Sequence, residues 1–88
     1  MNAREFSIAF ARSARKEIEA LDAEMARRVH TTIISLVTEP YPRGCRKLLG
    51  GRRRWRIRVG DYRIIYDVFE GERIVDVIAI RHRSEAYR

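Results

Sequence analysis

The chain has 88 residues, 45% hydrophobic and 35% charged, which suits one folded domain over residues 1–88 rather than a disordered chain. It lacks a transmembrane-length apolar run, a signal-peptide pattern and a second cysteine beside Cys45. We therefore expect a cytoplasmic protein with no membrane partner, disulfide, metal or cofactor. The net charge of +7 and the isoelectric point of about 10.5 favour a polyanionic partner, although they also suit a basic protein that is merely soluble.

The first half of the chain predicts a strand followed by two helices. Apolar and small residues alternate over 5–10, which is typical of a short strand. Apolar residues at helical spacing predict a helix over 11–21 and a second over 23–38. Asp22 is placed to cap the second helix, and Pro40 to end it. The short connection between the helices predicts an antiparallel helical hairpin.

The second half predicts a basic loop over 40–53 and then a three-stranded antiparallel meander. The strands are expected at 54–59, 62–69 and 73–80. Gly60 and Asp61 suit a two-residue type II′ turn between the first two strands. The third strand is apolar on both faces, which indicates a place inside the sheet, and residues 81–88 form a short polar tail. The fold class is therefore α+β, with one sheet packed on the two helices.

Basic residues concentrate in the loop and the hairpin. Nine of the 19 lysine and arginine residues lie between positions 43 and 63, where only Asp61 opposes them. In the whole chain only Lys16 and Lys47 are lysine. A guanidinium grips phosphate through two parallel hydrogen bonds, whereas an ammonium is a point charge. This bias towards arginine suits a partner that carries phosphate groups, although an acidic protein also fits the charge.

The two-residue turn determines which hairpin residues face one another, because each step outward pairs the next residue of each strand. One face of the hairpin is then apolar and should pack on the helices. It carries Trp55, Ile57, Val59, Tyr62, Ile64 and Tyr66. The opposite face carries Arg54, Arg56, Arg58 and Arg63, with Ile65 and Asp67.

On the second face Arg58 is expected to lie directly opposite Arg63, an arrangement that destabilises a strand pair. Either the two side chains extend into water, or an anion normally lies between them. Arginines on a rigid sheet suit a phosphate whose negative charge grows in a transition state. Arg81 follows the third strand, and its face depends on whether the turn at 70–72 counts two or three residues.

Three stretches of the chain resemble the RelE branch of the RelE/ParE toxin superfamily. They are Lys47-Leu48-x-Gly, then Trp-Arg-Ile-Arg-Val-Gly-Asp-Tyr-Arg-Ile-Ile-Tyr at 55–66, then Ile-Arg-His-Arg-Ser-Glu-Ala-Tyr-Arg at 80–88. The central run is a strong signature of the superfamily and is less specific for any one activity within it. The predicted order of strand, two helices and three strands fits the same family.

The resemblance implies a toxin that cuts messenger RNA on the ribosome without a metal and that is neutralised by an acidic antitoxin. In such toxins the substrate's 2′-hydroxyl attacks the adjacent phosphate, which leaves a cyclic phosphate and a free 5′-hydroxyl. By this resemblance Arg56 and Arg58 match the basic pair on the strand, although the turn here is shorter than in the founding member. Arg63 matches the arginine after the turn, Arg81 one beyond the last strand, and Tyr87 the C-terminal tyrosine that stacks on a base.

An arginine is a poor general base, because its pKa lies above ~12. His82 is the natural candidate for the proton transfer, since an imidazole titrates near neutral pH. The alternative is that His82 only hydrogen-bonds the tail. Five further basic residues are expected to bind RNA without taking part in the chemistry. They are Lys47, Arg52, Arg53, Arg54 and Arg83.

Two other functions fit the same pattern. A ParE-like toxin would inhibit DNA gyrase by binding it, without being an enzyme. A basic module that binds nucleic acid and has lost its activity is the third possibility. The fold is common to all three, so the fold cannot decide between them.

Overall fold

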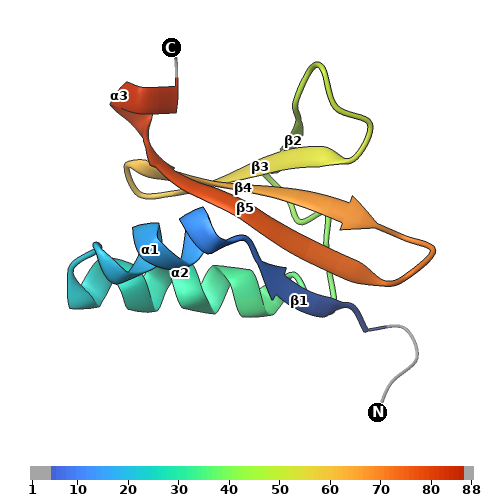
Figure 1. Cartoon of the computed structure of the whole chain (residues 1–88), viewed down its shortest axis with the longest axis horizontal. Helices are drawn as coiled ribbons and strands as arrows, with labels where there is room; N and C mark the ends of the chain where they lie inside the picture. The colour runs from blue at the N-terminus through green and yellow to red at the C-terminus, as the bar shows by residue number, and fades with distance from the viewer. Residues whose placement is uncertain (1–4, 87–88) are drawn as a thin grey trace.

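The computed structural model describes residues 5–86 and contains one mixed sheet, with the two longer helices on one of its faces and a short C-terminal helix on the other side (Figure 1). The elements in chain order are β1 (Ser7–Phe10), α1 (Arg12–Glu19), α2 (Ala23–Ser35), β2 (Arg46–Lys47), β3 (Arg54–Val59), β4 (Tyr62–Phe69), β5 (Ile74–His82) and α3 (Arg83–Ala86). The strand order is β1-β5-β4-β3-β2, with β1 parallel to β5 and every other pair antiparallel. The α+β class and the three-stranded meander are confirmed.

The core lies between the sheet and α2. Val29 and Ile33 on α2 are buried against Ile64 and Tyr66 on β4. The Tyr66 hydroxyl donates to the Pro40 carbonyl at 2.8 Å, so a buried hydrogen bond joins the middle of the sheet to the segment after α2. Burial raises the pKa of Tyr66. No helix within residues 5–86 is long and apolar enough to cross a membrane.

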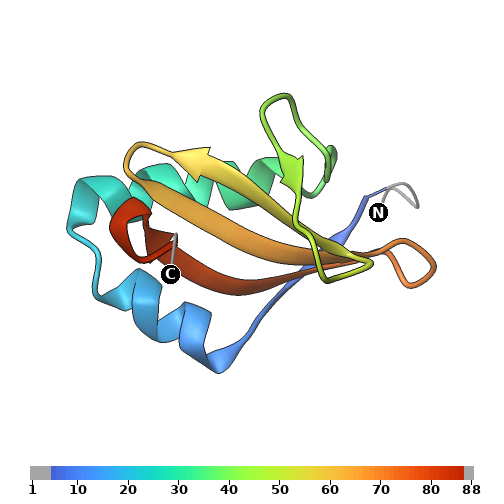
Figure 2. The same cartoon turned by 90° about the horizontal axis from the view of Figure 1, so that it is seen from above.

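Helix α1 runs beside β5, beyond the point where β1 ends (Figure 2). Two of its side chains satisfy backbone groups of β5 that have no neighbouring strand. The Ser13 hydroxyl donates to the Ile78 carbonyl at 3.1 Å, and the Ile80 backbone N–H donates to the Glu17 carboxylate at 2.8 Å. The helix therefore protects the edge of the sheet where β1 no longer does.

Several element boundaries differ from the sequence-based expectation. The helices stop at Glu19 and Ser35, before the expected ends at 21 and 38, and β1 begins at Ser7. Arg73 has a φ of 57°, a left-handed conformation that delays the start of β5 to Ile74. Two elements were not predicted: β2 inside the basic loop, and α3 in the polar tail.

Local sequence signals were accurate at the cap and in the hairpin. The Asp22 side chain accepts a hydrogen bond from the Met25 backbone N–H at 2.8 Å, which confirms the predicted N-cap of α2. Every predicted pair of the β3–β4 hairpin is present, including Arg58 opposite Arg63. Gly60 begins the turn with a φ of 58°, as a type II′ turn requires.

Candidate active site

Three arginines lie side by side across the sheet, on the face away from α2. Arg58 on β3 pairs with Arg63 on β4, and Arg63 pairs in turn with Arg81 on β5. Directly paired residues point to the same face of a sheet. The structure therefore places Arg81 on the arginine face, a point that the sequence left open.

The three arginines, here called the arginine row, differ in their surroundings. Arg63, in the middle, is only 3% exposed, so the interpretation in which both hairpin arginines extend into water is wrong for Arg63. Arg58 is exposed. Arg81 forms an ion pair with Glu17 of α1, a residue that sequence reasoning missed because the two lie 64 positions apart.

A hollow of about 270 Å³ opens at the Arg58 and Arg63 end of the row, between the β3–β4 turn and α3. This turn hollow is lined by Arg58, Gly60, Asp61, Tyr62, Arg63, Arg83 and Ser84. The Arg83 backbone N–H donates to the Asp61 carbonyl at 2.8 Å, which docks the start of α3 on the turn. Arginines from β3, β4 and α3 thus line one opening, an arrangement suited to a phosphate group.

His82 lies outside the turn hollow and reaches it through Ser84. Its backbone pairs with Tyr62, and the two rings meet edge to face with centroids 5.2 Å apart. His82 Nδ1 lies 2.9 Å from the Ser84 hydroxyl oxygen, and the Ser84 backbone N–H also points to it, at 3.3 Å. His82 therefore hydrogen-bonds the start of α3, as one of the two interpretations held. The Ser84 hydroxyl connects His82 to the hollow. Proton transfer by His82 stays a prediction.

Two other predicted site residues lie elsewhere. Arg56 is half-buried on the arginine face, further from the turn, where its neighbours in the sheet are Arg46 on β2 and Ile65 on β4. It does not line the turn hollow. Tyr87 lies outside the described residues.

Among the five residues predicted to bind RNA, only Arg83 lines the turn hollow. The others lie near the opposite end of the sheet, by the 48–53 loop and the β4–β5 turn (Figure 1). There Arg54 makes two hydrogen bonds to the Asp67 carboxylate, at 2.9 and 3.1 Å, which raise the pKa of Arg54. Asp67 pairs in the sheet with Asp76, so the arginine face carries carboxylates at this end.

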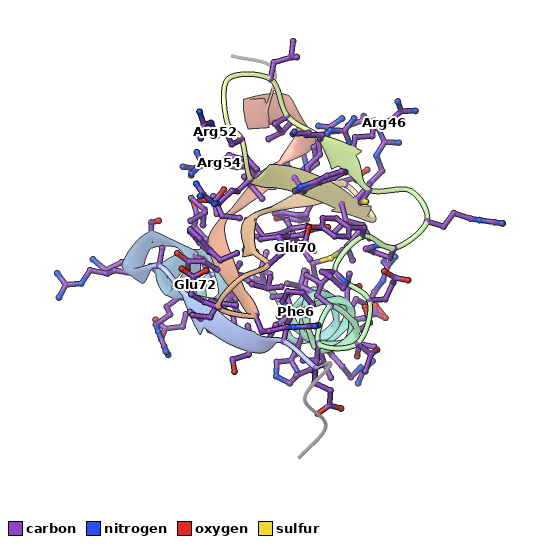
Figure 3. All side chains as sticks on the ribbon, turned by 90° about the vertical axis from the view of Figure 1, so that its right-hand side faces the viewer. Phe6, Arg46, Arg52, Arg54, Glu70 and Glu72 are labelled. Atoms are coloured by element: carbon purple, nitrogen blue, oxygen red, sulfur yellow. The ribbon has the colours of Figure 1, made fainter. Side chains whose placement is uncertain are left out.

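Figure 3 looks onto this opposite end, where Arg52 and Arg54 lie on one side and Arg46 on the other, with Glu70 and Glu72 below them. Lys47, Arg52 and Arg53 line a second hollow of about 530 Å³ together with the two glutamates. The Arg53 guanidinium lies over the Phe69 ring, 5.2 Å from its centroid. The mixed charge makes this end less suited to a polyanion than the turn hollow.

Comparison with known proteins agrees with this fold. The sequence profile of the ParE toxin of type II toxin–antitoxin systems (parDE) matches residues 8–87. The RelE–RelB complex of Pyrococcus horikoshii contains a similar chain, with 26% identity, a TM-score of 0.81, and coverage of 90% of this chain and 96% of that one. No curated protein sequence matches the chain.

Two further solved structures share the fold at lower identity. The isolated Escherichia coli RelE toxin has 24% identity and a TM-score of 0.78, with 93% of this chain and 90% of that one covered. The YoeB/ParE toxin of Agrobacterium tumefaciens has 21% identity and a TM-score of 0.75, with coverage of 88% and 98%. With the profile match, which covers most of the chain, they lead to one conclusion: this protein belongs to the ParE toxin family of type II toxin–antitoxin systems, within the RelE/ParE superfamily.

Proposed function

We propose that the protein is an endoribonuclease toxin that cleaves messenger RNA on the ribosome. The observation that carries the proposal is the convergence of Arg58, Arg63 and Arg83 on the turn hollow. Such a site stabilises charge that develops on a phosphate, whereas a surface that only docks on a protein needs no buried guanidinium.

In the proposed reaction the 2′-oxygen of one nucleotide attacks its own 3′-phosphorus, and the bond from phosphorus to the 5′-oxygen of the next nucleotide breaks. The products are a 2′,3′-cyclic phosphate and a free 5′-hydroxyl. Arg58 and Arg63 hold the non-bridging oxygens, whose negative charge grows as the fifth bond to phosphorus forms. We assign Arg56, further along the same face, to a neighbouring phosphate. Tyr87 would stack on a base, a role that rests on the family resemblance.

The reaction also moves two protons: one leaves the 2′-hydroxyl and one reaches the departing 5′-oxygen. Ser84 connects the hollow to His82, because its hydroxyl oxygen lies 2.9 Å from His82 Nδ1. We therefore assign His82 the role of acid–base group, with Ser84 passing the proton between the imidazole and the hollow. Arg81 would support the row from β5, while its pair with Glu17 balances part of the charge.

Two partners follow from this proposal. The first is the ribosome, which would present the message and restrict the toxin to the cytoplasm. The second is an acidic antitoxin, because the net charge of +7 needs an opposite charge to neutralise it. The solved relatives from Pyrococcus horikoshii and Mycobacterium tuberculosis are toxin–antitoxin complexes, which supports such a partner here.

The second candidate function is inhibition of DNA gyrase by binding. The observation that favours it is the profile match, because the matching family is named for ParE toxins. In that case the arginine row would meet acidic groups of a protein, and neither Ser84 nor His82 would be needed for activity.

Expression of the toxin with end mapping of messenger RNA on translating ribosomes distinguishes the two functions. The nuclease predicts cuts in phase with codons, with a cyclic phosphate upstream of each cut. The cuts should disappear in Arg58→Gln, which alters an exposed residue of the hollow, and persist in Arg43→Gln, which removes the same charge from an exposed position outside it. Intact messages together with gyrase-linked DNA breaks would assign the gyrase function instead.

A further inference from the structure

A second basic groove adjoins the turn hollow on the side of α2. It has a volume of about 440 Å³, and its polar lining comes from Arg27, Arg28, Thr31, Thr32 and Arg58, with Gly60 at its edge. The four α2 residues occupy positions i, i+1, i+4 and i+5, which form one strip along a helix. The strip flanks the face of the helix that carries the buried Val29 and Ile33, and Arg28 reaches the β3–β4 turn at Gly60.

The α2 groove and the turn hollow adjoin at the β3–β4 turn, because Arg58 and Gly60 line both. A Cβ at Gly60 would lie 3.0 Å from Met25 Cε and 3.3 Å from Arg28 Nη1, so the Arg28 guanidinium lies against the backbone of the turn. A chain that leaves the hollow past the exposed Arg58 side chain therefore meets the arginines of α2 next.

The chemistry of the groove is that of an anion site. No acidic residue lines it, and among the side chains described, those of residues 5–84, no carboxylate forms an ion pair with Arg27, Arg28 or Arg58. Thr32 donates its hydroxyl to the Arg28 carbonyl at 3.0 Å, whereas Thr31 is exposed. At the opposite end of the sheet, by contrast, Asp67, Glu70 and Glu72 accompany the arginines.

We propose that the α2 groove binds the phosphate next to the scissile one on the same RNA strand, held by the Arg27 and Arg28 guanidiniums and the Thr31 hydroxyl. This inference rests on the proposed nuclease function and extends it by assigning the path of the substrate. We prefer RNA over an acidic protein as the ligand because the groove adjoins the turn hollow, whose arginines suit a phosphate group. The groove adds affinity and takes no part in the bond changes.

Binding of short single-stranded RNA to the whole purified chain tests this path. The probes are fluorescein-labelled oligonucleotides with 2′-O-methyl groups, which cannot be cleaved, in lengths from two to six nucleotides. The test variant is Arg27→Gln/Arg28→Gln, and the matched control is Arg12→Gln/Arg15→Gln on α1, which removes the same charge outside both cavities. Fluorescence anisotropy between 50 and 200 mM salt gives the dissociation constants.

Loss of the one phosphate contact in the groove lowers the slope of log affinity against log salt by about 0.7 for a single strand. The wild type should then lose roughly two- to threefold more affinity than the test variant between those salt concentrations. The effect is expected for the longer RNAs and not for the dinucleotide, which fills only the turn hollow. The control should keep the wild-type dependence on length.

Several results would overturn the inference. One is a test variant that behaves like the control, and another is an equal loss at every length. Unchanged RNA binding with weakened binding of the antitoxin would assign the groove to a protein. Absence of RNA binding by the wild type at 50 mM salt would also overturn it, while codon-phased cleavage on ribosomes would show the nuclease proposal intact. If circular dichroism shows that the double variant is misfolded, Arg27→Gln alone replaces it as the test variant, and half the change in slope is expected.

Discussion

The substitution Arg58→Gln should stabilise the free protein while it removes the affinity for phosphate. Arg58 faces Arg63 directly, and Arg63 is 3% exposed, so water screens this pair incompletely. On the other side of the row, Glu17 forms an ion pair with Arg81. Like charges opposed across a strand pair cost about 0.2–1 kcal/mol. For a domain of this size that corresponds to a melting temperature about 1–8 °C higher in the variant.

Thermal unfolding followed by circular dichroism measures this effect, in chloride and in inorganic phosphate at matched ionic strength. Phosphate at ten times its dissociation constant should stabilise the wild type by about 1.4 kcal/mol, and the variant by much less. Arg43→Gln, which removes one charge from an exposed loop position, should respond to phosphate as the wild type does. The reasoning is refuted if Arg58→Gln melts below the wild type in chloride, or if phosphate raises both melting temperatures equally.

Three other experiments test the fold. Tyr66→Phe removes the hydrogen bond to Pro40 and should lower the free energy of unfolding by about 1–3 kcal/mol in urea titrations at neutral pH. Burial raises the pKa of Tyr66, so its contribution to the free energy of unfolding is fully present below pH ~10 and is lost as the pH rises towards the folded-state pKa. The variant Tyr66→Phe should lack this alkaline loss. An alkaline profile that is the same in the variant and the wild type would contradict the assignment. Asp22→Ala should cost about 1 kcal/mol by removing the N-cap, and no loss of stability would show that the cap is dispensable. A double-mutant cycle with Arg54→Met and Asp67→Asn should give a coupling of about 1 kcal/mol, which a value near zero would disprove.

Local patterns in the sequence predicted the parts of the structure whose cause is local. The N-cap at Asp22 depends on a backbone N–H three residues away. The register of the β3–β4 hairpin depends on a two-residue turn beginning at Gly60 and on the alternation of apolar residues. A slip by one residue would turn the apolar face into solvent, so only one register buries Ile64 and Tyr66.

The secondary structure of the polar tail was not predicted, because it depends on contacts with residues that are distant in the sequence. β5 extends to His82 since the strand continues to pair with β4 as far as Tyr62. α3 then begins where Arg83 docks on the Asp61 carbonyl and Ser84 meets His82. Its residues carry no apolar pattern that would have predicted a helix, so the turn hollow that α3 helps to form could not be predicted from sequence alone.

The sequence by itself determined the family-typical hairpin and the face that carries Arg58 and Arg63. The tertiary structure decided the face of Arg81. Pairs along β4 and β5 run regularly from Phe69 to Tyr66, and then the register shifts by one residue so that Ile65 pairs with Ala79. A bulge of this kind moves every later side chain to the other face, and it brings Arg81 beside Arg63. No local pattern marks that shift, because it depends on how β5 fits between β4 and α1.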